Sequence, residues 1–152
     1  AMLPVRAPGR FQCAVGYVGV YDLPERLKTW AALFDDATGA SLKRSLGEDT
    51  AVLNAISPVN LAGQIKVPML LIHGGQDEIA TPVQFKRMKK ALEKVGNPPE
   101  TLFEDDEDHG FYDEQNLKKM YTRLEDFLRR HLNKPQGRTG DITQSGTSAA
   151  LR

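Results

Sequence analysis

Apolar and polar residues follow a clear pattern between residues 67 and 104. The run VPMLLIHGG at 67–75 is almost continuously apolar and closes on two glycines, which predicts a strand buried on both faces of a sheet. Apolar residues then recur at helical spacing and predict one inward face, made of Phe85, Met88, Leu92 and Val95. The short run ETLFE at 100–104 predicts another strand. A strand, a helix and a second strand therefore follow one another.

The helix between these strands carries signals at both ends. Thr81 is placed as its N-cap, Pro82 as its first residue, and Gln84 as the residue that closes a capping box. Gly96 is a natural stop at the other end. A longer helix is expected after the last strand, and its inward positions are Leu117, Met120, Leu124, Phe127, Leu128 and, as a further candidate, Leu132.

The first half of the chain has a weaker pattern. FQCAVGYVGVYDL combines valine, aromatic residues and glycine, which indicates a buried strand over about 13–18 and then a loop. Helical spacing of apolar residues predicts a helix over 24–34. Between residues 35 and 60 the pattern is irregular and favours short helices around 41–46 and 50–56.

Strands joined by helices predict a parallel sheet with helices on both faces, which is an α/β fold. Three strands make a thin sheet, and an apolar edge strand is an aggregation hazard. We therefore expect residues 1–132 to be part of a larger domain. Residues 133–152 are rich in glycine, serine and threonine and contain few large apolar residues, so a flexible tail is expected there.

Two loops are the candidates for chemistry, because functional groups in such sheets gather after the carboxyl ends of strands. HGGQDEIATP contains Asp77, and EDDEDHGF contains His109. A crossover helix between the two strands would bring both residues to the same sheet edge. An aspartate there can fix the tautomer of the histidine and stabilise its imidazolium. The pattern predicts the acid–base half of a nucleophilic hydrolase.

Simpler explanations compete for the same residues. Asp77 in a Gly-rich turn can cap that turn, and a lone His109 is more often a surface residue. The acids at 104–108 lack the ligand spacing and the glycine of a calcium loop, so we expect them to be solvated. His73 is expected to be a structural histidine bonded to the backbone, and His131 closes a helix, where a cation favours the helix dipole.

The stretch PMLLIHGGQDEIATPVQFKRMKKALEKVGNPPETLFEDDEDHGFYDE resembles the C-terminal end of the α/β-hydrolase catalytic domain in the prolyl oligopeptidase family of serine peptidases. The likeness extends over about 5–131 and is most specific at 67–114. It implies that Asp77 is the triad aspartate and His109 the triad histidine. Relatives often have glycines before this histidine, where the present chain has three acids.

The family's nucleophile is the serine of a G-x-S-x-G motif between a strand and a helix. The sequence contains no such motif. In the family's order of serine, aspartate and histidine, the missing serine would lie a little before Ala1. The resemblance also implies that Val18 and Tyr21 line the pocket for the substrate residue before the scissile bond. It further implies a peptide substrate and, often, an N-terminal β-propeller; a homo-oligomer stays open.

Composition bears on the partners, cofactors and location that can be expected. Twenty basic and twenty acidic residues cancel, so charge gives no reason to expect nucleic acid or a membrane surface as a partner. No apolar run approaches the roughly 20 residues of a spanning helix. Cys13 is the single cysteine, which excludes an internal disulfide and a cysteine metal cluster. We expect no metal and no cofactor. A cytoplasmic location is the default, although a leader could belong to the missing N-terminal part.

Three functions stay open. The first is a serine-type peptidase of the dipeptidyl or acylaminoacyl kind, to which this chain supplies the aspartate and the histidine while being inactive alone. The second is a small-molecule esterase with the same triad. The third is a non-catalytic α/β interaction module that docks its exposed first strand against a partner sheet.

Overall fold

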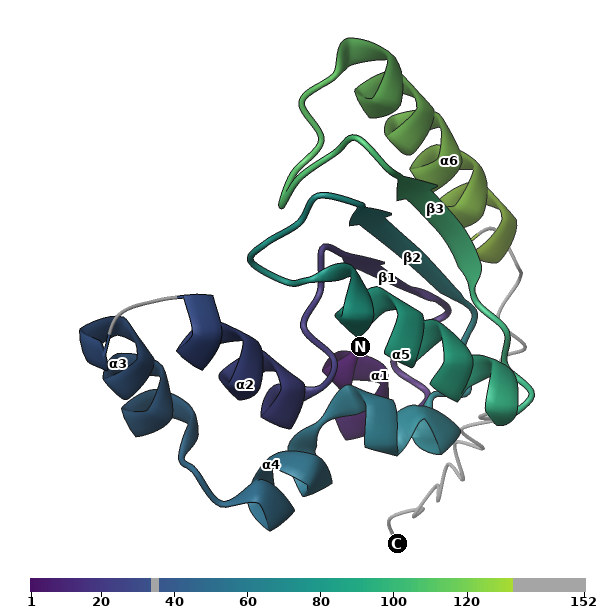
Figure 1. The fold of residues 1–152 in the computed structure, drawn as a ribbon. Helices are drawn as coiled ribbons and strands as arrows, with labels where there is room; N and C mark the ends of the chain where they lie inside the picture. The colour runs from purple at the N-terminus through teal and green to yellow at the C-terminus, as the bar shows by residue number, and fades with distance from the viewer. Residues whose placement is uncertain (34–35, 133–152) are drawn as a thin grey trace, which may run out of the picture.

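The computed structural model describes residues 1–33 and 36–132, with the side chains at 31–33, 36–39 and 42 left out (Figure 1). The sheet has the order β1-β2-β3, and both strand pairs are parallel. Ala14 lies opposite Met69, and Leu70 lies opposite Glu100. The strands are β1 (Ala14–Tyr17), β2 (Met69–Gly74) and β3 (Glu100–Glu104). The predicted parallel sheet is confirmed; the tail predicted at 133–152 lies outside the described residues.

Helices occupy most of the remaining described chain. Those predicted over 24–34, 41–46 and 50–56 are present, and the second of them begins earlier than expected. The helices are α1 (Met2–Arg6), α2 (Leu23–Leu33), α3 (Asp36–Leu46), α4 (Thr50–Ile56), the 3-10 helix η1 (Pro58–Gln64), α5 (Pro82–Lys94) and α6 (Glu114–Leu132).

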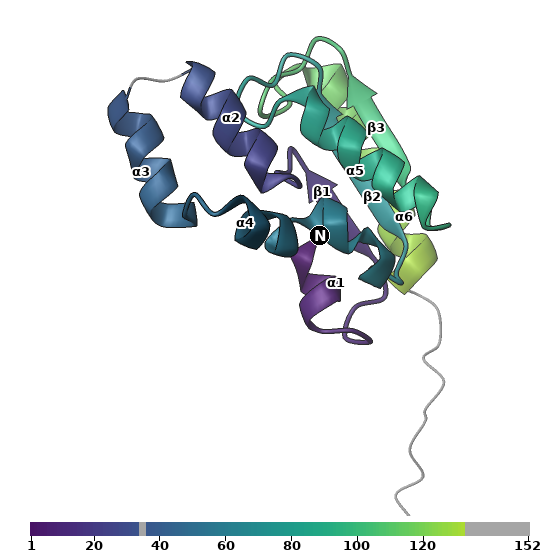
Figure 2. The ribbon, with the colours of Figure 1, turned by 60° about the horizontal axis from the view of Figure 1, so that its bottom comes forward.

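The sheet lies between two helical layers, and β2 is its centre. All six residues of β2 are buried, as its continuous apolar run predicts. Because side chains alternate along a strand, Leu71 faces α5 and packs in a cluster with Phe85 and Met88. Leu70 and Ile72 belong to a second cluster, which includes Phe127 of α6. Figures 1 and 2 show α5 and α6 on opposite faces of the sheet.

The predicted inward faces of α5 and α6 are right except at their last positions. Val95 is 47% exposed and is the C-cap of α5 rather than a helical residue. Leu132 is 51% exposed at the end of α6, whereas Leu117, Leu124 and Leu128 pack against the core. In both helices, the apolar periodicity of the sequence continues for one position beyond the last side chain that packs against the sheet. Gly96, with φ 76°, lies just beyond α5 and is the expected stop.

The capping box predicted at the start of α5 is wrong. Thr81 makes no side-chain capping bond, and Gln84 is buried and points elsewhere. Its Oε1 accepts the backbone N–H groups of Tyr21 (2.8 Å) and Asp22 (2.7 Å), while its Nε2 donates to the Asp22 carbonyl (2.9 Å). These backbone groups in the loop after β1 would otherwise be buried without partners. Gln84 therefore joins that loop to α5.

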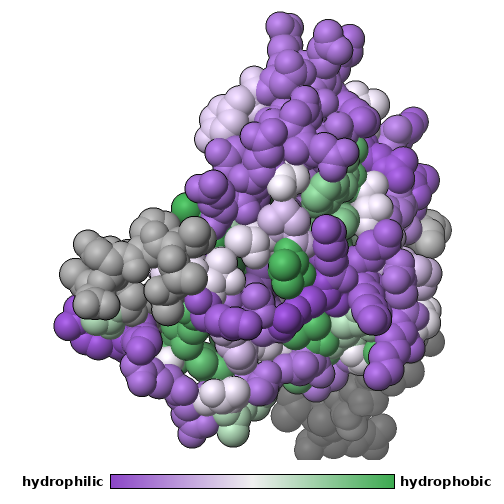
Figure 3. Space-filling view, viewed as in Figure 1, coloured by the Kyte–Doolittle hydropathy of each residue, from purple (hydrophilic) through white to green (hydrophobic). Residues whose placement is uncertain are grey.

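The remaining helices lie beside the sheet. Figure 1 shows α2, α3 and α4 as a group next to α5 and η1. Arg87 of α5 binds Asp22 (2.6 Å) and Glu25 (2.7 Å) and ties α2 to α5. The face of the molecule seen in Figure 3 is mainly hydrophilic, with hydrophobic colour only in small separate areas. None of the helices within the described ranges has the length and apolar character that crossing a bilayer requires.

Candidate active site

Asp77 lies in the loop between β2 and α5, at the carboxyl edge of the sheet. Its side chain is buried, and its Oδ1 accepts the backbone N–H groups of Ile79 (2.9 Å) and Ala80 (2.7 Å). The turn-capping explanation is therefore true of this residue, but it is incomplete. The two bonds hold the carboxylate in one orientation, with Oδ2 directed toward the next loop of the sheet edge.

His109 lies in that next loop, between β3 and α6, and meets Asp77. Its Nδ1 is 2.9 Å from Asp77 Oδ2 and 3.1 Å from Oδ1. Since a carboxylate only accepts hydrogen bonds, Nδ1–H is the donor and Nε2 of the neutral ring carries the lone pair. The His109 side chain is 41% exposed, while that of Asp77 is fully buried. The structure thus brings together the two residues predicted from separate loops.

Two glycines allow the loops to approach so closely. A Cβ at Gly74 would overlap the carbonyl oxygens of Glu107 and Asp108, and one at Gly75 would lie 2.5 Å from the Asp105 oxygen. Backbone hydrogen bonds join the loops: Gly75 N–H donates to the Glu104 carbonyl (2.7 Å) and Gln76 N–H to the Glu107 carbonyl (2.8 Å).

His73 fills the space behind Asp77. Its ring is buried, Nε2–H donates to the Ala80 carbonyl (2.6 Å), and the predicted structural role is confirmed. Its Nε2 is also 3.5 Å from Asp77 Oδ2. Burial lowers the pKa of His73, and the Ala80 bond and the Asp77 charge oppose that shift. Asp77 therefore lies between a buried neutral histidine and an exposed one.

Glu107 corrects the expectation that all the acids before His109 are solvated. Asp105, Asp106 and Asp108 are exposed, but the side chain of Glu104 is 12% exposed and pairs with Lys119, and Glu107 is only 3% exposed. Its carboxylate accepts the backbone N–H groups of Tyr112 (2.7 Å) and Asp113 (3.1 Å). In an acidic run, nothing in the sequence distinguishes the one buried member. The only hint of this burial is the turn that follows His109, because its backbone N–H groups need hydrogen-bond acceptors.

Tyr17, at the carboxyl end of β1, is a second contact that the sequence did not reveal. Its hydroxyl accepts the backbone N–H of Phe111 at 2.7 Å. The two rings meet edge to face, with centroids 5.7 Å apart. Burial raises the pKa of Tyr17, so the hydroxyl stays protonated near neutral pH. Tyr17 thus holds the chain two residues after His109.

The structure places the two predicted substrate-pocket residues differently. Val18 follows β1, is half-buried and has φ 43°, an uncommon and strained conformation for a β-branched residue. Tyr21 is 2% exposed and packs in the core with Met69 and Leu71. Its hydroxyl finds no hydrogen-bond partner within the described residues. A substrate contact by either residue stays a prediction.

Arg26 of α2 is a buried cation that was not predicted from the sequence. It is 7% exposed, and its guanidinium carbon lies 3.8 Å from the ring centroid of Trp30. Burial lowers the pKa of Arg26 to about 10, while the charge of Asp77 acts in the opposite direction. The negative charge of Asp77 therefore favours the charged form of Arg26.

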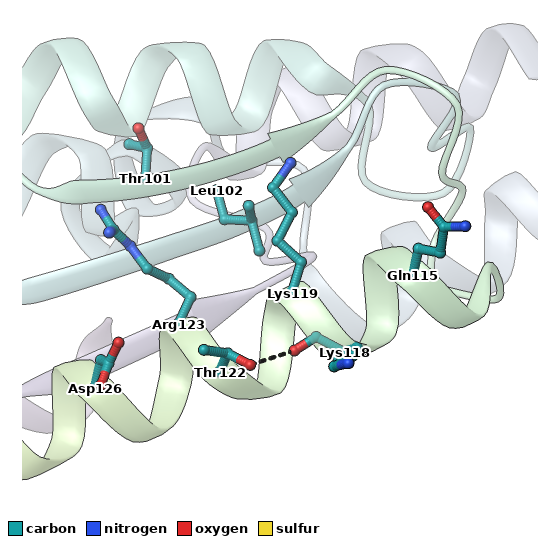
Figure 4. Close-up of a pocket in the computed structure, with 8 residues that line it drawn as sticks. All are labelled: Thr101, Leu102, Gln115, Lys118, Lys119, Thr122, Arg123 and Asp126. Atoms are coloured by element: carbon teal, nitrogen blue, oxygen red, sulfur yellow. Dashed lines mark hydrogen bonds between the residues drawn. The ribbon is translucent and has the colours of Figure 1, made fainter.

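A groove elsewhere on the molecule does not include this pair. It has a volume of about 770 Å³ and lies between β3 and α6, where Lys119 and Arg123 extend toward the strand (Figure 4). The lining residues are Thr101, Leu102, Gln115, Lys118, Lys119, Thr122, Arg123 and Asp126. Among the described residues, no three histidine, cysteine or acidic side chains are grouped so that they could hold a metal ion.

Comparison with solved structures defines the class of fold. A Pyrococcus horikoshii acylaminoacyl peptidase matches with TM-score 0.72 and 20% identity over 88% of this chain and 22% of its own. A Mycobacterium tuberculosis puromycin-hydrolyzing peptidase matches with TM-score 0.74 and 23% identity over 88% of this chain and 20% of its own. The chain has the α/β-hydrolase fold, of which it contains three parallel strands and flanking helices.

Sequence comparison then gives the family. Residues 1–135 match the model of the prolyl oligopeptidase family, and the chain belongs to that family. It is 28% identical to dipeptidyl aminopeptidase BIII of Pseudoxanthomonas mexicana over 95% of this chain and 21% of that protein. It is 27% identical to dipeptidyl peptidase family member 6 of Caenorhabditis elegans over 82% of this chain and 18% of that protein. The chain thus spans about a fifth of the length of these relatives.

Proposed function

We propose that this chain supplies the aspartate and the histidine of a catalytic triad in a serine-type peptidase. The observation that carries the proposal is the 2.9 Å contact between His109 Nδ1 and the buried, doubly anchored Asp77 carboxylate. It leaves the lone pair of Nε2 on an exposed ring available for a proton. Membership of the prolyl oligopeptidase family supports the same assignment.

The proposed mechanism has two steps that His109 serves in opposite roles. A serine hydroxyl attacks the peptide carbonyl, and His109 Nε2 takes the hydroxyl proton. The imidazolium is stabilised by Asp77 and gives that proton to the leaving amine, so an acyl-enzyme forms. His109 then takes a proton from water, which attacks the ester, and returns it to the serine as the acid product leaves. Asp77 stays ionised throughout.

The serine and the oxyanion donors are proposed to come from a segment upstream of this sequence, which contains no G-x-S-x-G motif. On this proposal, residues 1–152 alone are inactive. The substrates proposed are peptides with a free or an acylated amino end, because relatives are named dipeptidyl and acylaminoacyl peptidases. The strained Val18 at the same sheet edge is the better of the two proposed pocket residues.

The test uses the full-length enzyme that contains this chain, with His109→Ala and Asp77→Asn. We expect kcat on a peptide anilide to fall by about 10⁶-fold for His109→Ala, which removes the base itself, and by about 10⁴-fold for Asp77→Asn, which favours the wrong tautomer. His131→Ala, at the far end of α6, is the matched control and should leave kcat near wild type. Normal turnover by His109→Ala would refute the proposal.

A second arm of the same experiment separates peptidase from esterase. Both substrates carry the same acyl group, and only the leaving group differs between an amine and an alcohol. A peptidase should hydrolyse both, because protonation of the amine by His109 is part of its mechanism. Hydrolysis of the ester alone, with no measurable amide cleavage, would assign the triad to an esterase.

A further inference from the structure

His109 lies on a short loop, and the backbone N–H groups at 111–113 that follow it all donate to side chains. The three residues at 111–113 have N–H groups that precede α6 and cannot be used within it. Phe111 N–H donates to the hydroxyl of Tyr17, while the N–H groups of the next two residues donate to the carboxylate of Glu107. Three successive backbone donors after the histidine thus bind two side chains, one from the end of β1 and one from the start of the histidine loop.

Glu107 also reaches the loop that carries Asp77. Its backbone carbonyl accepts the N–H of Gln76, the residue directly before Asp77, at 2.8 Å. The same residue therefore holds the aspartate loop through its main chain and the chain beyond His109 through its side chain. Gly74 makes this possible, because any side chain there would overlap the Glu107 carbonyl.

We propose that Glu107 and Tyr17 are positioning residues, which hold the His109 ring on Asp77 without contacting the substrate. The inference rests on the proposed function, since it concerns the same histidine. His109 is exposed and makes its ring contact to a fixed carboxylate, so the position of its backbone decides whether Nδ1 stays 2.9 Å from Oδ2. Glu107 holds the start of the loop through its backbone and its end through its carboxylate, and Tyr17 adds a second contact at Phe111.

Conservative variants remove the two tethers one at a time. Glu107→Gln keeps the shape and one acceptor oxygen but sets an NH₂ group against one of the two N–H donors. Tyr17→Phe removes the acceptor for Phe111 and keeps the ring packed on that side chain. Asp105→Asn is the matched control, because it removes one negative charge from the same loop at an exposed position.

Kinetics of the full-length enzyme distinguish positioning from general damage. For Glu107→Gln and Tyr17→Phe we expect kcat to fall by about 10- to 100-fold, because small misplacements of a reacting group have effects of this size. KM should stay within about twofold, since neither residue binds substrate. Asp105→Asn should keep both constants near wild type. Equal losses in all three variants would point to general damage of the loop rather than to position and would overturn the inference.

A second readout does not depend on turnover. The His109 Nδ1 proton, which donates to Asp77, is expected to give a far-downfield proton resonance while the pair is intact. We expect this resonance to broaden or disappear through faster solvent exchange in Glu107→Gln and Tyr17→Phe and to persist in Asp105→Asn. If Glu107→Gln fails to fold, Tyr17→Phe still decides the matter, because its ring packing is kept.

The outcomes separate this inference from the proposed function. Normal activity of His109→Ala would remove the triad assignment itself. If His109→Ala is inactive while both tether variants keep wild-type kcat and a sharp Nδ1 resonance, the triad assignment stands and the positioning role is wrong.

Discussion

At the scale of single residues, side chains of the candidate site bind the backbone of a turn and a second group at the same time. Asp77 caps its own turn with Oδ1 and binds His109 with Oδ2. Because the capping bonds are local, a Gly-rich turn with an aspartate was predictable from the sequence. Glu107 was not predictable, because burial of one acid among several depends on how two distant loops pack.

His73 gives a prediction about pH at this scale. Burial lowers its native pKa below the ordinary 6.5, so between these values the unfolded chain binds a proton that the native protein does not. Stability is therefore full above about pH 6.5 and is lost as the pH falls toward the native pKa, by up to about 1.4 kcal/mol per pH unit.

The variant His73→Gln keeps a donor for the Ala80 carbonyl but does not titrate. We expect the free energy of unfolding of the wild type, measured by urea denaturation and relative to His73→Gln, to fall between about pH 7 and about pH 5. A difference that stays constant over this range would show that His73 is protonated to the same extent in both states.

At the scale of elements, the apolar pattern was enough to predict the sheet but not the hydrogen bonds that hold its connecting loops in place. β2 is so continuously apolar, and α5 so regularly periodic, that their order and parallel sheet follow from the sequence alone. The start of α5 shows the limit. The position of Gln84 fits a local capping signal. In the structure, however, its side chain binds backbone groups of the loop after β1 instead. Local sequence cannot decide such a competition.

Gln84→Ala tests this tertiary role. The substitution leaves the N–H groups of Tyr21 and Asp22 without their acceptor in a buried place. We expect a loss in the free energy of unfolding on the order of 3 kcal/mol. Lys90→Ala, exposed on the same helix, is the control and should change stability by less than about 0.5 kcal/mol. Equal small losses in both variants would show that the Gln84 hydrogen bonds contribute little to stability.

At the scale of the whole molecule, the chain spans about a fifth of the length of its relatives, and its sheet is correspondingly small, with three strands among the described residues. Within the described residues, β1 pairs only with β2 and β3 only with β2. The aspartate and the histidine were predictable because both follow strands that the pattern defines. No nucleophile could be predicted, since the sequence contains no G-x-S-x-G motif. On the proposed function, the remaining sheet continues from the outer edge of β1.

Cys13 can report whether that edge is covered. This single cysteine lies directly before β1, is 9% exposed and packs in the cluster between the sheet and α6. Burial raises the pKa of its thiol, which further lowers the reactive thiolate fraction. A thiol reagent therefore modifies Cys13 mainly when β1 opens, and the rate measures the free energy of that opening.

We expect Cys13 to react at least about tenfold faster in residues 1–152 alone than in the proposed full-length enzyme, with the modified peptide identified by mass spectrometry. A strand with a partner on one edge opens more readily than a strand with two, and tenfold corresponds to about 1.4 kcal/mol of opening free energy. Labelling in denaturant, where both forms should react alike, corrects for intrinsic reactivity. Equal native rates would mean that nothing covers β1, and the chain would then be a self-sufficient module, as the interaction hypothesis requires.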